Sequence, residues 1–156
     1  LSGWYLKDNE GSVFCENEIV FEGKYSAKLS SPKPGITAFI SQKVEISPGH
    51  RIRIAFHYRM DYTKGTGARM YCYFRENGTS NIPNDELYTF YDEATLNIVR
   101  GGGYDIEGFS DTEGEWQKFD YIIQMPAIVH YFVFEIHAYA GTDLYIDDCY
   151  VVDTNM

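Results

Sequence analysis

The chain has 156 residues, of which 44% are hydrophobic and 23% are charged, so its length and composition fit one globular domain. Its net charge of −10 argues against binding to nucleic acids and to anionic membranes, because both require a basic surface. No run of residues approaches the roughly 18 consecutive apolar positions that a membrane-spanning helix needs.

Most of the chain alternates apolar and polar residues, which is the period of a β-strand with one buried face. This pattern predicts strands over residues 25–30, 36–46, 51–59, 68–76, 115–125, 131–140 and 143–152. Turns rich in Gly and Pro separate them, such as SPGH at 47–50. The expected core residues include Tyr25, Ile54, Phe56 and Phe134, whereas Val133 is expected to face outward.

The strand at residues 68–76, ARMYCYFRE, has two different faces. One face carries Met70, Cys72 and Phe74 and is a core face. The other alternates cations with aromatic rings: Arg69, Tyr71, Tyr73 and Arg75. Tyrosine packs with its ring and hydrogen-bonds with its hydroxyl, so this second face suits a half-solvated binding surface.

Residues 77–113 are the least patterned part of the chain and are too long for a plain hairpin loop. We expect an additional edge strand there, near LYTFY at 87–91 or TLNIVR at 95–100. This excursion either stands beside the outward face of residues 68–76 or lies across it. As a wall it would add Tyr88, Tyr91 or Tyr104 to that face.

About seven alternating strands joined by Gly and Pro turns predict an all-β fold, an antiparallel β-sandwich that forms a single domain over residues 1–156. The Cys…Trp…Cys signature of immunoglobulin domains is not present. The long strands and the single long excursion favour jelly-roll topology.

The three cysteines, Cys15, Cys72 and Cys149, form no C-x-x-C pair, which argues against a zinc site. Cys72 lies on a core face and is expected to be a buried free thiol. Cys15 and Cys149 either stay free or form a disulfide, which would require the first and last strands to be neighbours.

Catalytic motifs are not found: the chain contains no P-loop, no G-x-S-x-G and no histidine pair at metal-binding spacing. Glu135 and His137 are two residues apart on one strand face, where they could act as an acid/base pair beside the tyrosines. We therefore expect no enzymatic activity, with a small polysaccharide lyase as the remote alternative.

The segments GW, EGKYSAKLS, ISQKVEISPGHRIRIAFHYR, GEWQKFDYIIQMP and GTDLYIDDCYVV follow one another in a characteristic order. In this order the chain resembles carbohydrate-binding modules of the four/nine type, which are galactose-binding-domain-like jelly rolls, over about residues 3–152. The resemblance implies a non-catalytic accessory module, attached to neighbouring domains of a larger chain, that is secreted or displayed on a bacterial cell surface with its leader removed.

In the resembling modules the strands that correspond to residues 36–42, 68–76 and 131–140 form a concave sheet whose outer face often binds glycans, and we expect residues 68–76 in the middle of this sheet. This implies a polysaccharide or oligosaccharide ligand and the candidate contacts Phe39, Arg69, Tyr71, Tyr73, Arg75, Glu135, His137 and Tyr139. Flat rings pack against the C–H faces of pyranose sugars, and charged side chains bind their hydroxyls. Arg69 and Arg75 would bind an acidic sugar. Alternatively, these residues form cross-strand pairs in a structural or adhesive module without a sugar site.

The resembling modules also often hold a structural calcium ion near the last strand. Asp148 in YIDDC is the candidate ligand, and Asp8, Glu10 or Glu18 could replace the family's usual acidic residue upstream of GW. Alternatively, Asp147 and Asp148 only hydrogen-bond a loop. On the other sheet, Arg53, His57, Arg59 and Asp120 are expected to form a solvated outer face with ion pairs.

Overall fold

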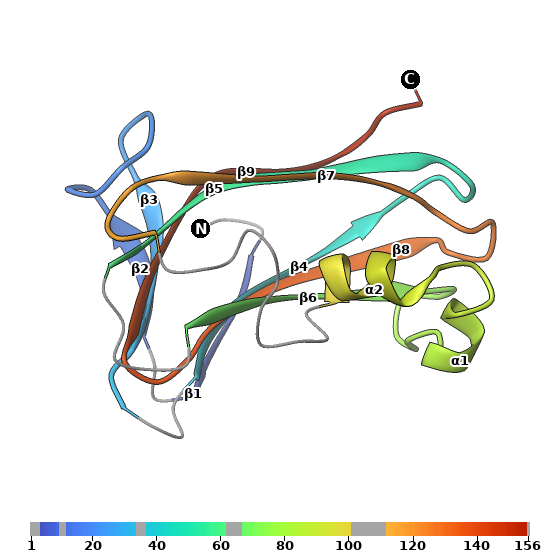
Figure 1. The fold of residues 1–156 in the computed structure, drawn as a ribbon, viewed down its shortest axis with the longest axis horizontal. Coiled ribbons are helices and arrows are strands. Elements are labelled where there is room, and N and C mark those ends of the chain that lie inside the picture. Colours follow the sequence, from blue (N-terminus) through green and yellow to red (C-terminus); the bar gives the residue numbers. More distant parts are fainter. Residues whose placement is uncertain (1–3, 10–11, 34–36, 62–66, 101–111, 156) are drawn as a thin grey trace.

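The computed structural model describes residues 4–9, 12–33, 37–61, 67–100 and 112–155. The strands in these ranges form two antiparallel sheets that stack on each other (Figure 1). The first is a four-stranded sheet in the order β1 (Tyr5–Asn9), β4 (Thr37–Glu45), β8 (Tyr131–Ala138), β6 (Ala68–Arg75). The second is a five-stranded sheet in the order β2 (Ser12–Glu16), β3 (Ser26–Ser31), β9 (Thr142–Asp153), β5 (Arg51–Asp61), β7 (Gln117–Gln124). The predicted all-β sandwich with jelly-roll topology is confirmed.

The core lies between the two sheets and is built by the alternation that the sequence shows. Along β6, every second residue is buried, and Cys72 is 1% exposed, as predicted. Phe56 of β5 and Phe134 of β8 meet across the sandwich with ring centroids 5.7 Å apart. Trp4 packs edge-on against the same Phe134 ring at 6.1 Å. These contacts join the two sheets, so the outward residues of every strand are left for the surface.

One prediction of burial is wrong. Tyr25 is 60% exposed, because β3 begins only at Ser26 and the tyrosine lies in the preceding loop. Val133 points away from the core, as predicted, and is nevertheless only 4% exposed. It lies on β8, an inner strand, where its neighbours across the sheet are Lys43 and Tyr73, and these long side chains cover it.

The position of β6 also differs from the expected one. We expected residues 68–76 in the middle of their sheet, but β6 is its outer strand and β8 lies between β4 and β6. The strand pattern could not reveal this order, because alternation reports which face is buried and not which strands are neighbours.

The expected edge strand in the excursion is wrong, because residues 84–100 form two short helices, α1 (Asn84–Leu87) and α2 (Glu93–Arg100). The Asp92 side chain accepts a hydrogen bond from the Thr95 backbone at 2.7 Å, and the Asp92 carbonyl accepts one from Leu96. Asp92 followed by Glu93 is a helix-start signal that outweighs the β-propensity of the neighbouring aromatic and branched residues.

The two helices close one open side of the sandwich. Leu87 and Leu96 are 1% and 2% exposed and belong to the core. The Tyr91 ring packs against Phe74 of β6 at 5.6 Å, and its hydroxyl donates a hydrogen bond to the Gln124 carbonyl of β7. The excursion therefore connects the outer strands of the two sheets at the end of the sandwich seen in Figure 1. No helix of the described ranges is long and apolar enough to cross a membrane.

All three cysteines are free thiols, so the disulfide alternative for Cys15 and Cys149 is wrong in this structure. Cys15 lies on β2 and is paired with Ala27 of β3, whose partner on the other side is Ile146 of β9. A whole strand thus separates the first cysteine from the strand of the last.

We predict that the excursion contributes to the stability of the whole domain. Leu96→Ala should lower the free energy of unfolding by about 2–5 kcal/mol, because it removes a buried side chain from the core. Tyr88→Ala is the matched control on the same excursion, since Tyr88 is 51% exposed, and it should be nearly neutral. Urea unfolding measures both, and a neutral Leu96→Ala would contradict the role of the helices in the core.

We also predict selective thiol chemistry. Burial, with a smaller contribution from the Asp148 carboxylate, raises the pKa of Cys149 to about 12, and Cys72 is buried. In the folded protein an Ellman assay should therefore modify only the exposed Cys15, and Cys15→Ser should abolish the rapid reaction. After unfolding without a reductant all three thiols should react. Detection of Cys72 alone would instead indicate a Cys15–Cys149 disulfide.

Candidate functional site

The outer face of the four-stranded sheet gathers most of the predicted site residues. Antiparallel pairing places Ser41, Glu135 and Tyr71 opposite one another on β4, β8 and β6. The adjacent row consists of Phe39, His137 and Arg69. Residues directly opposite each other in such a pair share a face of the sheet. We call the outward side chains of this sheet the tyrosine face: Tyr5, Ser41, Lys43, Arg69, Tyr71, Tyr73, Arg75, Tyr131, Val133, Glu135, His137 and Tyr139.

Tyr5 is the member of this face that our sequence analysis missed. It lies on the outer strand β1, opposite Ser41, and its side chain is 64% exposed. The segment before residue 12 is too short for a clear alternating pattern, and only its pairing with β4 brings Tyr5 to the face. For Phe39 the structure gives the backbone register alone, since its side chain is outside the described part.

Four side chains of the tyrosine face form a continuous hydrogen-bonded chain. The hydroxyls of Tyr71 and Tyr139 are 2.7 Å apart, Tyr139 Oη is 3.4 Å from His137 Nδ1, and His137 Nε2 is 3.0 Å from Glu135 Oε2. A carboxylate can only accept, so His137 Nε2 donates to Glu135. This series of hydrogen bonds fixes the orientation of the Glu135 side chain.

Tyr139 remains a neutral phenol within this chain. Burial raises the pKa of its hydroxyl well above the ordinary range, and the hydrogen bond with Tyr71 acts in the same direction. The Arg69 guanidinium lies 5.7 Å from the centre of the Tyr139 ring and opposes this shift in part. The cation therefore packs on the ring as a cation–π contact without ionising the phenol.

The tyrosine face is neither fully solvated nor buried. The Glu135 and His137 side chains are 19% and 16% exposed, and Tyr71 and Tyr73 are half-buried. In a purely structural face both tyrosines would be fully buried, whereas here they are half-buried. Within the described part of the excursion, residues 82–96 pack against the core side of β6 and against β7.

Arg75 has a different role from its neighbours. Its Nε donates to Asn81 Oδ1 at 2.7 Å, and another nitrogen lies 3.4 Å from the Gly78 carbonyl. Lys43, two strands away, donates to the same carbonyl at 3.3 Å. The loop at residues 76–81 is thus held across one end of the tyrosine face as a border. Arg75 anchors this border, and its contact with a ligand stays a prediction.

The aspartates of YIDDC have protein partners. Asp147 Oδ2 accepts hydrogen bonds from the backbone of Phe21 and Glu22 at 2.9 and 3.1 Å. This agrees with the alternative that Asp147 hydrogen-bonds a loop. Asp148 adopts a positive φ of 48° at a bulge in β9, with Oδ2 3.4 Å from His57 Nδ1. Within the described ranges no group of three or more His, Cys, Asp or Glu could hold a metal ion. The side chains of Asp8 and Glu10 are outside those ranges, so a calcium ion at Asp148 stays a prediction.

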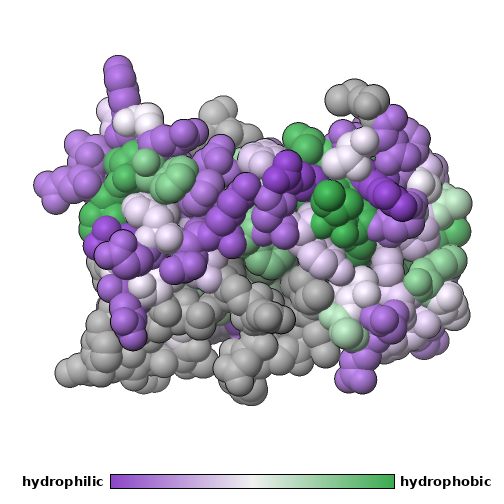
Figure 2. All heavy atoms as spheres, turned by 45° about the horizontal axis from the view of Figure 1, so that its top comes forward, coloured by the Kyte–Doolittle hydropathy of each residue, from purple (hydrophilic) through white to green (hydrophobic). Residues whose placement is uncertain are grey.

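The outer face of the five-stranded sheet is mainly a solvated surface with ion pairs, as predicted. Arg53 Nε donates to Asp120 at 2.6 Å, and Lys118 lies 2.9 Å from the same carboxylate. His57 differs from the expectation, because the loop before β3 folds over it and stacks the Phe21 ring on the imidazole at 3.7 Å. Figure 2 brings this side of the molecule forward and shows hydrophilic residues around separate hydrophobic patches.

Comparison with known proteins confirms the resemblance at the level of the fold. No protein-family model matches the chain, and no curated protein matches it. A family 16 carbohydrate-binding module is similar, with a TM-score of 0.61 and 17% identity over 94% of this chain and 89% of that chain. The family 22 xylan-binding domain of a Paenibacillus barcinonensis protein has a TM-score of 0.62 and 11% identity, over 99% of this chain and 87% of its own.

A third similar structure is the enzymatically active domain of tailspike protein 4 from bacteriophage CBA120, with a TM-score of 0.66 and 14% identity. The match covers 97% of this chain but 19% of the tailspike chain. This chain therefore corresponds to about a fifth of the phage protein and to nearly the whole of the two binding modules. The fold is that of carbohydrate-binding modules, and the ligand must be argued from the site.

We predict a tyrosine that titrates late. Because burial raises the pKa of Tyr139, the stability that its neutral form supports is complete below about pH 10, the pKa of an unfolded tyrosine, and is lost as pH rises above it. In protein labelled with ¹³C-tyrosine, the Cζ signal that is absent from Tyr139→Phe should titrate at a higher pH in the folded than in the unfolded chain. Titration at the same pH in both states would contradict the hydrogen-bonded arrangement.

Proposed function

We propose that this chain is a non-catalytic carbohydrate-binding module that holds an oligosaccharide on the tyrosine face. The observation that carries the proposal is the cluster of Arg69, Tyr71, Glu135, His137 and Tyr139, which is half-buried and already hydrogen-bonded. Such preorganisation lowers the entropy cost of binding a flexible ligand. The fold shared with known carbohydrate-binding modules supports the same conclusion.

The chemistry of the face suits a sugar chain. Tyr5 and Tyr71 offer aromatic rings on the two outer strands of the sheet, and three strand spacings of ~4.8 Å separate them by roughly 14 Å. This distance requires an oligosaccharide to reach both. Glu135, held by His137, keeps its second carboxylate oxygen as an acceptor for sugar hydroxyls, which are donors that a carboxylate binds strongly.

An acidic ligand would use a different set of contacts from the one that the sequence suggested. The guanidinium of Arg75 is engaged by Asn81 and Gly78 at the border loop. Arg69 is the cation that would meet a uronic-acid carboxylate beside the Tyr139 ring. Its position over Tyr139 also allows it to bind neutral hydroxyls, so the site accommodates neutral glycans as well.

A lyase is the alternative that the same cluster raises, because Tyr, His and Arg lie together. A general base works best with a pKa near the operating pH. The pKa of Tyr139 is instead shifted upward by burial, away from that range. This shift favours binding over proton abstraction. We infer that the chain acts as one module of a longer, secreted or surface-displayed protein, as the resemblance implies.

We predict that Tyr71→Ala lowers glycan affinity about tenfold or more, because aromatic anchors at the centre of a site contribute most to binding. Affinity gel electrophoresis across a panel of neutral and acidic polysaccharides would identify the ligand, and calorimetry with its oligosaccharides would measure the change. The matched control is Tyr150→Ala: this half-buried tyrosine packs beside a cation, Arg53, on the outer face of the other sheet.

The control variant should bind as the natural protein does. Equal losses in the two variants would place the site elsewhere, and no binding to any glycan of the panel would favour a structural or adhesive module. Unsaturated products from an acidic glycan, lost in His137→Ala, would instead establish the lyase.

A further inference from the structure

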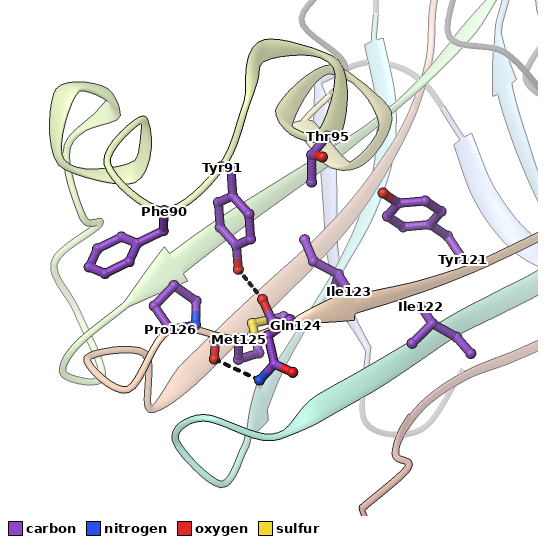
Figure 3. Close-up of a pocket in the computed structure, with 9 residues that line it drawn as sticks. All are labelled: Phe90, Tyr91, Thr95, Tyr121, Ile122, Ile123, Gln124, Met125 and Pro126. Carbon is purple, nitrogen blue, oxygen red and sulfur yellow. Dashed lines mark hydrogen bonds between the residues drawn. The ribbon is translucent and has the colours of Figure 1, made fainter.

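A second surface feature lies on the opposite sheet, beside β7. Here a hollow of about 370 Å³ opens between β7 and the segment that joins the two helices (Figure 3). It shares no residue with the tyrosine face. Its walls are mostly apolar or aromatic and include Phe90, Tyr91, Tyr121, Ile122, Met125 and Pro126.

This hollow leaves apolar side chains in solvent. Phe90 is 49% exposed and Ile122 is 53% exposed, although the sandwich core beneath them is filled. In Figure 3 the rings of Phe90 and Tyr91 approach from the helical segment and Tyr121 approaches from β7, while Ile122 points to the other face of the strand. Exposed apolar groups that gather in a concave site mark a binding surface more than isolated ones do.

The backbone of β7 also offers unused hydrogen-bonding groups at this hollow. The backbone N–H of Met125 donates to the His50 carbonyl, which precedes β5. In an antiparallel pair only every second residue bonds to the same neighbour, so the N–H and C=O groups of Ile122 and Gln124 point away from β5. On the side of β7 that faces away from β5, the Gln124 carbonyl accepts a hydrogen bond from the Tyr91 hydroxyl at 2.6 Å. Among the described residues, none forms a hydrogen bond with the backbone N–H or C=O of Ile122.

The side chains of Gln124, Tyr91 and Thr95 at the hollow are already engaged. The Gln124 amide nitrogen donates to the Gly49 carbonyl, and its amide oxygen accepts from Arg51. The backbone N–H of Thr95 donates to the Asp92 side chain at the start of α2. None of the residues that line the hollow is charged, so it lacks the partners that bind sugar hydroxyls most strongly. A free backbone donor and acceptor beside an apolar cavity instead match an extended polypeptide, which adds a strand to the sheet and inserts a side chain.

Charge specifies the peptide further. Asp92 and Glu93 adjoin the lining residues and are exposed, and the whole chain carries a net charge of −10. On β7 itself, the Asp120 carboxylate is already paired with Arg53 and Lys118, and Arg53 lies directly opposite Ile122. The acidic rim at the start of α2 therefore favours basic residues that flank the inserted apolar side chain.

We propose that the β7 edge is a docking site for an extended peptide that alternates apolar and basic residues, bound by strand addition at Ile122. This function is separate from sugar binding. It would attach the module to a neighbouring polypeptide while the tyrosine face remains available to a glycan.

The test is an NMR titration of the ¹⁵N-labelled protein with the capped peptide Lys-Val-Lys-Val-Lys. The amide signals of Tyr121, Ile122 and Gln124 should shift, while those of Glu135 and His137 should not. Ile122→Pro removes the outward N–H together with the isoleucine side chain, and a proline is tolerated where an edge strand faces solvent. It should weaken peptide binding about tenfold, as for the loss of a hydrogen bond. Ile122→Val keeps the N–H and an apolar side chain and should bind normally.

A second control uses Val152, which is 42% exposed on the same sheet, so Val152→Ala should leave binding unchanged. An N-methylated version of the peptide removes the backbone donors without any change to the protein and should not bind. The proposal is overturned if the N-methylated or the corresponding Glu-Val peptide binds equally well. It is also overturned if neutral oligosaccharides, and not the basic peptide, shift the signals of β7.

Discussion

The apolar contact between the two sheets is the constraint on which the surface of this protein depends. Phe56, Phe134 and Trp4 bring the sheets together, and each strand must turn alternate residues toward that contact. The residues in between are then fixed in their direction before any ligand is considered. A one-residue slip in β6 would bury Tyr71 and Arg69 and expose Cys72, so the same packing that stabilises the sandwich also orients the tyrosine face.

Sheet pairing converts these directions into a site. Glu135 and His137 on the inner strand β8 lie between Ser41 and Phe39 on one side and Tyr71 and Arg69 on the other. Because the hydrogen bonds from Tyr71 through Tyr139 and His137 to Glu135 satisfy one another, the polar cluster can remain half-buried without a large desolvation cost. A rigid, partly dry surface of this kind is suited to recognition.

The excursion between β6 and β7 serves both sheets. Its first residues border the tyrosine face through Gly78, and its helices place Leu87 and Leu96 in the core. The same helical segment forms one wall of the hollow beside β7 through Phe90. A single insertion thus stabilises the open side of the sandwich and shapes two separate surfaces, in keeping with the tendency of long loops to carry function.

The sequence by itself determined the strands, the core faces and the outward set of Arg69, Tyr71 and Tyr73, because alternation is a local property that each segment carries alone. The tertiary structure decided which strands are neighbours: it moved β6 to the edge and added Tyr5 from β1. It also turned the expected edge strand into helices and assigned Arg75 to the border loop. Those outcomes depend on pairing and loop contacts between segments distant in the chain, which no local pattern encodes.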